Sequence, residues 1–333
     1  MIAPWWLFWG LASALALALY PLAGAVTTIA ALRLFHGAAF VIMVSAITAI
    51  LVHFIPQGRS AQAFGLFTVM TQLPFALMPL LVERIIRATG DAAHAYALVA
   101  PAMLPALLLA WPLLRTTRAM AMADPRHGGQ RPKAADIAAN LRSPGVGLLL
   151  AANLLVFLGT TSVYFFMKDR YLSLGLSEIG VFFSVVTAAT IAVRLAGARI
   201  FDRLDTRRVV AVVLLFLAVC LAFMGQARLL RDSLVLAAGY GLAMGVALPL
   251  LSSAMFQRSA PAFRGLNSNL MLFMMDAGFF LGPLLWAALL AGGTSWETLY
   301  FLAGLPVVCA CCAAWAAIPA RGRQGEEAGP SAG

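Results

Sequence analysis

Long apolar segments separated by short polar loops run along the whole chain. Most segments reach the roughly 20 residues that a helix needs to cross a bilayer. Backbone groups in lipid must be satisfied within each segment, which favours helices, and no run of alternating polarity indicates a β-barrel. The pattern predicts about ten spans, at 4–24, 27–54, 62–88, 93–115, 145–168, 176–201, 208–227, 232–257, 264–291 and 296–319.

One long polar stretch, 116–144, divides these spans into four and six. The predicted fold is an all-α polytopic membrane helical bundle with pseudo-two-fold halves. Its expected parts are a partial N-terminal bundle at 1–115, a cytoplasmic linker at 116–144, a six-helix bundle at 145–320 and a disordered tail at 321–333. Within the linker, residues 133–142 are expected to form a short surface helix.

Composition excludes a soluble protein. Hydrophobic residues make up 62% of the chain and charged residues 11%, with a mean hydropathy of +0.91. The net charge of +10 is spread over short loops, so we expect no nucleic-acid partner. Placing both termini in the cytoplasm puts most Lys and Arg residues on the cytoplasmic side, as expected for a multi-pass protein of the inner cell membrane.

The sequence contains no nucleophile–base set, phosphate-binding loop or metal cluster. All four cysteines lie within apolar segments without metal-ligand spacing, which favours small buried residues over a disulfide or metal set. We therefore expect neither an enzyme nor a cofactor.

Two loops repeat each other. Pro56-Gln57-Gly58-Arg59 and, 205 positions later, Pro261-Ala262-Phe263-Arg264 each link two apolar segments. A third loop, at 197–208, has no earlier counterpart, because the same offset would place it before Met1. The pattern predicts a two-fold repeat whose first half lacks its beginning, through either a late start assignment or a truncated gene.

The loop at 197–208 resembles a motif of the major facilitator superfamily, Gly-x-x-x-Asp-Arg-x-Gly-Arg-Arg, found between helices 2 and 3 and again between helices 8 and 9. The matching residues are Gly197, Asp202, Arg203, Arg207 and Arg208. The spacing after Gly197 is one residue longer, and Asp205 replaces the later glycine. The resemblance implies a cytoplasmic latch between helix ends. The alternative is ordinary positive charge on the inner side.

A second match is Arg33-Leu34-Phe35-His36-Gly37, which resembles the helix 4 signature Arg-x-x-Gln-Gly of that superfamily. The resemblance associates Arg33 with proton coupling, with His36 in place of the glutamine and Gly37 as a packing position. A charged side chain within a span is a functional candidate. Alternatively, Arg33 reaches the membrane surface.

The third match, Asp276 to Pro283, resembles helix 11 of many members. Gly278 and Gly282 form a small-xxx-small packing face, and Pro283 bends the helix. Asp276 is the one acid deep within a predicted span. It is either a proton or substrate site or a partner of a neighbouring helix.

The resemblance implies two bundles that rock about a central cavity. The polar residues that would line it are Arg33, His36, Gln72, Asn153, Thr160, Thr161, Tyr164, Asn269 and Asp276. Each hydroxyl could instead bond back to its own helix. The aromatic-rich stretch 157–166 suits either a hydrophobic or amphipathic substrate or plain packing. Arg194, one turn before Gly197, resembles an arginine that precedes the loop glycine in the superfamily, and helix termination or a latch is expected there in preference to substrate contact.

The favoured hypothesis is secondary transport by a monomer, as proton-coupled efflux of a small organic molecule, with protons and the lipid bilayer as further partners. Two alternatives stay open: an importer of a metabolite with the same fold, and a truncated, non-transporting remnant or scaffold.

Overall fold

The computed structural model describes residues 3–56, 58–109, 112, 115–116, 133–176, 179–197 and 200–320. These residues contain helices and no strand. The chain divides into two compact units. The first unit holds Met1–Phe54 and Pro74–Pro132, and the second unit holds Ile55–Leu73 and Lys133–Gly333.

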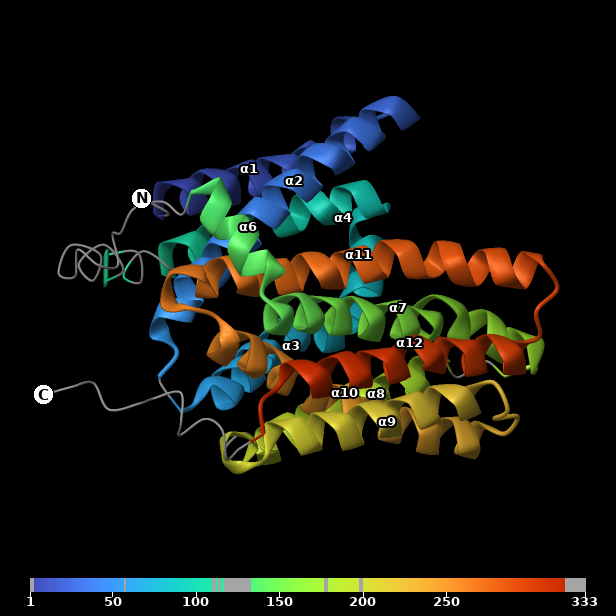
Figure 1. The fold of residues 1–333 in the computed structure, drawn as a ribbon. Helices are drawn as coiled ribbons and strands as arrows, with labels where there is room; N and C mark the ends of the chain where they lie inside the picture. The colour runs from blue at the N-terminus through green and yellow to red at the C-terminus, as the bar shows by residue number, and fades with distance from the viewer. Residues whose placement is uncertain are drawn as a thin grey trace, which may run out of the picture. The chain divides into compact units, whose positions relative to one another are not determined.

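The first unit is built from α1 (Ala3–Leu19), α2 (Val26–Leu51), the C-terminal part of α3 (Ser60–Thr89) and α4 (Ala92–Val99). Short 3-10 turns follow three of these helices, at Tyr20–Leu22, Val52–Phe54 and Ala100–Ala102. In Figure 1, α1 lies alongside α2, and it also contacts α4. The small core of this unit consists of Trp6, Ala46, Ile50 and Leu107.

The second unit contains the N-terminal part of α3 and seven further helices. These are α6 (Ala134–Arg142), α7 (Pro144–Ser173), α8 (Ile179–Gly197), α9 (Thr206–Met224), α10 (Leu230–Arg258), α11 (Arg264–Ala291) and α12 (Trp296–Ala317). Two 3-10 turns, Phe201–Arg203 and Pro261–Phe263, precede α9 and α11.

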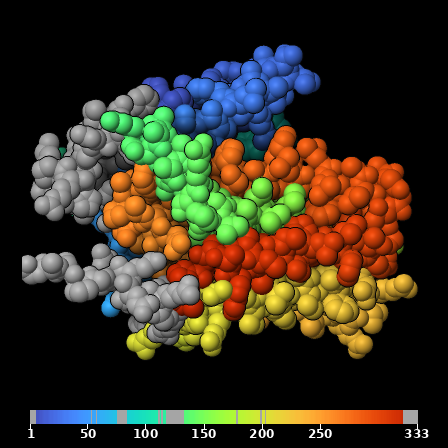
Figure 2. Space-filling view, viewed as in Figure 1, coloured from blue at the N-terminus to red at the C-terminus, as the bar shows by residue number. Residues whose placement is uncertain are grey.

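Helix α12 lies between α7 and α9, and these three helices form one continuous face of the second unit (Figures 1 and 2). Helix α10 packs on α8 and α9, and α11 packs on α7. A single large core joins all of them, with Leu149, Phe182, Leu214, Leu250 and Tyr300 fully buried. Long apolar helices bury their side chains here against one another, as membrane bundles do.

Eight helical segments of the described residues are long and apolar enough to cross a membrane. They are Val26–Leu51, Ala92–Leu109, Pro144–Ser173, Ile179–Gly197, Thr206–Met224, Leu230–Arg258, Pro261–Ala291 and Trp296–Ala317. The other two predicted spans are also helical. One is a shorter apolar helix, Trp6–Leu22, and the other is α3, whose 30 residues are not among the eight.

The predicted surface helix is confirmed as α6, which begins after Lys133. Asp136 in its first turn accepts a hydrogen bond from the Lys133 backbone N–H at 3.0 Å, which caps the helix start. Most of the linker before residue 133 and the tail at 321–333 lie outside the described residues. The predicted domain boundaries stay a prediction.

Candidate functional site

Helices α8 and α10 cross in close contact. A Cβ at Gly241 or at Gly245 would collide with atoms of α8, so only glycine allows this approach. At this crossing the Thr190 hydroxyl lies 2.8 Å from the Val186 carbonyl of its own helix and 2.9 Å from the Gly241 carbonyl of α10.

One turn further along α8, Arg194 meets a break in the hydrogen bonding of α10. Pro249 lies inside α10 and has no N–H, so the carbonyl four residues earlier, that of Gly245, loses its usual helical donor. The Nε of Arg194 donates to this carbonyl at 3.2 Å, and Nη2 reaches the Met244 carbonyl at 3.4 Å. The arginine therefore replaces a donor that the proline removes.

The guanidinium of Arg194 also donates, through Nη1, to the side-chain oxygen of Gln72 on α3. Arg194 is only 1% exposed, whereas Gln72 is half-buried. Gln72, one of the predicted cavity residues, is therefore hydrogen-bonded to the buried Arg194. The sequence indicated only a helix-ending or latching role for this arginine. A proline four residues after a glycine was the signal that a carbonyl needed an outside donor.

A polar cluster lies where α3 begins beside α10. The hydroxyls of Ser60 and Ser253 are 2.6 Å apart, and the amide of Gln257 donates to both, at 3.2 and 3.1 Å. Hydrogen bonds and small side chains hold this end of α3 on α10. The sequence alone did not indicate these residues.

Helices α7, α8 and α11 together form an aromatic surface. Tyr164 of α7 stacks on Phe183 of α8 with ring centroids 6.2 Å apart, and Phe279 of α11 lies 5.4 Å from Tyr164. Phe157 and Phe165 complete the group around Phe279. Tyr164 remains 43% exposed. We call these five rings the aromatic surface.

Asp276 lies on α11 one turn before Phe279 and is exposed. Asn269, two turns before Asp276, is half-buried and donates to the Gly265 carbonyl of its own helix at 3.1 Å. Helical spacing thus puts an acid beside the aromatic surface.

The other predicted cavity residues of α7 are buried and used in packing. Thr160 and Thr161 donate back to the carbonyls of Val156 and Leu158, at 2.9 and 2.7 Å. Asn153 donates to the Met271 carbonyl of α11 at 2.6 Å. Thr160 and Thr161 therefore bond within α7, whereas Asn153 links α7 to α11.

The glycines of α11 have the packing geometry expected of them. A Cβ at Gly278 would lie 2.7 Å from the Cβ of Phe157, and one at Gly282 would collide with Thr161. Trp286, one turn beyond Gly282, donates its indole N–H to the Leu158 carbonyl at 2.9 Å. Pro283 is accommodated within α11. Gly37 on α2 differs, because no atom lies within 4 Å of its Cβ position.

Arg33 and His36 in the first unit both contact one tyrosine. The Arg33 guanidinium lies 5.5 Å from the ring centroids of Tyr20 and Tyr96, and Nδ1 of His36 lies 3.3 Å from the Tyr20 hydroxyl. Arg33 is exposed and His36 half-buried. The helix 4 signature therefore lies in a small aromatic and cationic cluster.

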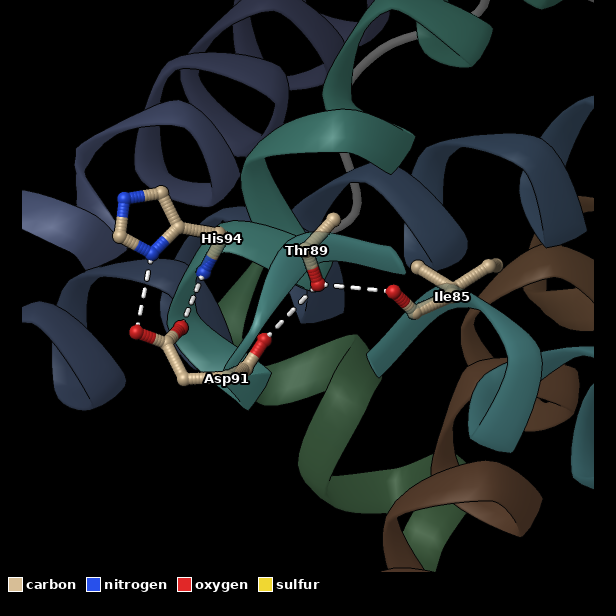
Figure 3. Close-up of polar contacts among 4 residues, drawn as sticks. All are labelled: Ile85, Thr89, Asp91 and His94. Atoms are coloured by element: carbon tan, nitrogen blue, oxygen red, sulfur yellow. Dashed lines mark hydrogen bonds and ion pairs between the residues drawn. The ribbon is translucent and has the colours of Figure 1, made fainter. Parts of the chain in front are cut away.

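The turn that joins α3 to α4 is shown in Figure 3. Asp91 caps α4: its carboxylate accepts the His94 backbone N–H at 2.8 Å and contacts Nδ1 of His94 at 2.9 Å. These hydrogen bonds, chiefly the one from the backbone, lower the pKa of Asp91. The hydroxyl of Thr89 bridges the carbonyls of Ile85 and Asp91 (Figure 3).

The loop at 197–208 orders the start of α9. Asp205, which stands where the motif has glycine, caps α9 by accepting the Arg208 backbone N–H at 3.3 Å, and it pairs with the Arg208 side chain at 3.2 Å. Arg207 stacks on Trp315 of α12, 4.1 Å from its ring centroid. Gly197 packs against the ring of Phe201, and Arg203 is exposed. The side chain of Asp202 lies outside the described residues.

Several solved structures share this fold. The human organic anion transporter MFSD10 (TETRAN) has a TM-score of 0.73 and 20% identity, over 94% of this chain and 77% of that one. FucP in its outward conformation has a TM-score of 0.73 and 11% sequence identity, and the match covers 96% of this chain and 84% of FucP. The proton:xylose symporter XylE has a TM-score of 0.72 and 15% sequence identity, and the match covers 96% of this chain and 79% of XylE. At these identities the likeness concerns the fold.

No curated protein matches the chain at a significant level. A sequence model described as the Major Facilitator Superfamily matches residues 3–240, which is more than half of the chain. With its apolar helices, the protein is a multi-pass membrane protein of a family whose members are transporters and not enzymes. The chain belongs to the Major Facilitator Superfamily.

Proposed function

We propose that this protein exports a small organic molecule by alternating access and that protons drive the export. The supporting observation is the aromatic surface around Tyr164 and Phe279, which is partly exposed and has Asp276 one helical turn away. Aromatic rings bind apolar or amphipathic molecules, and an acid within a span is suited to carry a proton.

The same observation supports the direction of transport. The exposed part of the aromatic surface offers rings and few hydrogen-bonding groups, so it favours a molecule that itself partitions into lipid. Such molecules enter cells without help, and a carrier with this preference is useful for removing them. Both termini in the cytoplasm and a monomeric state remain part of this proposal.

Import is the second candidate. FucP is described as a fucose:proton symporter and XylE as a proton:xylose symporter, and both share the fold of this chain. A sugar importer, however, needs several hydrogen-bonding side chains directed at the substrate hydroxyls. Asn153, Thr160 and Thr161 are all engaged within the helix bundle.

Reconstitution into lipid vesicles tests the proposal. Vesicles containing the full chain would be loaded separately with dansylglycine, ethidium and xylose, and loss of each would be followed under an inward proton gradient. We expect loss of an aromatic probe that stops when a protonophore collapses the gradient. Uptake of external xylose into unloaded vesicles, driven by the same gradient, would support the importer instead, and no flux of any probe would support the scaffold hypothesis.

A further inference from the structure

Arg194 carries a buried positive charge without a buried negative partner. It is 1% exposed, and none of the ion pairs among the residues that the structure describes includes it. The acceptors of its three hydrogen bonds are all neutral: the carbonyls of Gly245 and Met244 and the amide of Gln72. A buried charge that lacks a counter-ion is costly, even when neutral dipoles surround it.

The restoration of the Gly245 hydrogen bond does not by itself require a cation. A neutral donor such as a glutamine or an asparagine amide could serve one carbonyl with less desolvation. A guanidinium, in contrast, provides five N–H donors in a planar fork that matches a carboxylate. The residue type therefore points to an anion that occupies the site for part of the transport cycle.

Gln72 occupies the acceptor position at Nη1 of Arg194 and is the most replaceable of the three partners. The two carbonyls belong to the α10 backbone, whereas Gln72 is a half-buried side chain with a flexible stem. Its neighbours Thr71 and Leu73 are exposed. A carboxylate is a stronger acceptor from a guanidinium than an amide oxygen, so an incoming acid would be favoured in exchange.

The surroundings define the rest of the ligand. Phe183, a member of the aromatic surface with Tyr164 and Phe279, precedes Arg194 on α8 by three turns and so shares its helix face, about 16 Å away along the axis. A molecule that placed a carboxylate on Arg194 and extended along this face would reach these rings. An aromatic or apolar body fits such a place.

Resting on the transport function proposed above, we propose that Arg194 binds the carboxylate of an amphipathic organic anion, which displaces the Gln72 amide. Displacement also breaks the hydrogen bond between α3 and α8. Without substrate, the side-chain oxygen of Gln72 occupies the acceptor position that the substrate carboxylate would take.

Binding of dansylglycine to the purified full chain in detergent provides the test. Dansylglycinamide, which lacks the charge but keeps the aromatic body, is the matched neutral probe. We expect dansylglycine to bind about tenfold more tightly, the size of one charge-assisted hydrogen bond. Equal affinities for the two probes, or tighter binding of dansylglycinamide, would overturn the proposal.

Two substitutions of Gln72 separate ligand exchange from a structural role. Gln72→Ala removes the internal competitor and is expected to tighten dansylglycine binding, whereas Gln72→Glu supplies a permanent carboxylate to Arg194 and is expected to weaken it. Thr71→Ala is the control, since the Thr71 hydroxyl donates to Thr68 on its own helix. Weaker binding by both Gln72 variants would assign Gln72 a purely structural role and contradict the exchange.

The vesicle experiment distinguishes this inference from the transport proposal. Gradient-driven loss of ethidium without loss of dansylglycine would leave transport standing and overturn the anion site. Carboxylate-selective binding without flux of any probe would leave the anion site standing and overturn the transport proposal.

Discussion

Arg194 of α8 donates through Nε to the carbonyl of Gly245 in α10, at 3.2 Å, in place of the amide that Pro249 lacks. A proline inside a helix leaves such a carbonyl to be satisfied from elsewhere. Here a neighbouring helix satisfies it, and glycines at 241 and 245 allow the neighbour to come close enough. The missing backbone hydrogen bond at Pro249 and the position of Arg194 therefore depend on each other.

This dependence predicts that Arg194 and Pro249 are energetically coupled. Pro249→Ala returns an N–H to the Gly245 carbonyl, so Arg194→Gln should cost less stability in that background than in the parent protein. The expected difference is about 1 kcal/mol, the value of one hydrogen bond. Thermal unfolding of the parent, both single variants and the double variant measures it, and additive effects would contradict the coupling.

Gly245→Ala should destabilise the second unit. The added methyl group would collide with Val193 and lie 3.0 Å from the Thr190 carbonyl oxygen, so α8 and α10 must separate. Overpacking of this kind costs about 1–3 kcal/mol. Gly180→Ala is the control on α8, because no atom lies within 4 Å of its Cβ position. Equal melting temperatures for the two variants would argue against a tight crossing.

Asp276→Asn should abolish proton-driven flux and leave membrane insertion unchanged. Asparagine keeps the shape and polarity of the side chain but cannot take up and release a proton. Because Asp276 is exposed on α11, the substitution disturbs no core packing. The readouts are gradient-driven probe efflux and the yield of folded protein in the membrane. Full flux in this variant would remove Asp276 from the proton path.

Arg33→Ala should likewise reduce transport, through loss of the cation that lies on Tyr20 and Tyr96. Arg33→Lys keeps the charge and is expected to retain part of the activity. Phe40→Ala is a control on α2, since Phe40 is exposed and lies outside this cluster. A similar loss of flux in the control variant would show that α2 tolerates no substitution and that Arg33 has no special role.

The Asp91 cap predicts a pH dependence of α4. Hydrogen bonds from His94 hold the pKa of Asp91 below its ordinary value of 3.8. A depressed carboxylate pKa stabilises the folded state above the unfolded value, and this stabilisation is lost as pH falls through the folded pKa. Amide exchange of residues 92–99 should be faster in Asp91→Ala than in the parent protein at pH 7. The two proteins should converge in acid, and equal exchange at pH 7 would show that the cap contributes nothing.

Much of the fold could be predicted from the sequence because each apolar segment must satisfy its own backbone in lipid. Segment length and loop position suffice for this, as α7, which contains the predicted span 145–168, illustrates. The loop at 197–208 shows how far a motif alone can predict structure. Asp205 departs from the motif glycine, yet it caps α9, a role that its residue type favours.

The candidate site was less predictable, because tertiary packing determines which hydrogen-bond partners the polar side chains within the spans contact. The hydroxyls of Thr160 and Thr161 donate to carbonyls of their own helix, α7. Gln72, in contrast, accepts a hydrogen bond from Arg194, 122 positions away in the sequence. Pro249 and Gly245 together implied an unpaired carbonyl, but nothing in their spacing named Arg194 as the donor. The contact depends on the register of α8 against α10, which apolar patterns do not specify.

Simultaneous recording of proton and probe movement in vesicles that contain only this protein tests the central claim most directly. Dansylglycine efflux would be followed by its fluorescence, and proton entry by a pH-sensitive dye in the same vesicles. We predict that each flux requires the other and that both disappear in Asp276→Asn. Probe efflux that continues without proton entry, or no flux of either species, would contradict proton-coupled export.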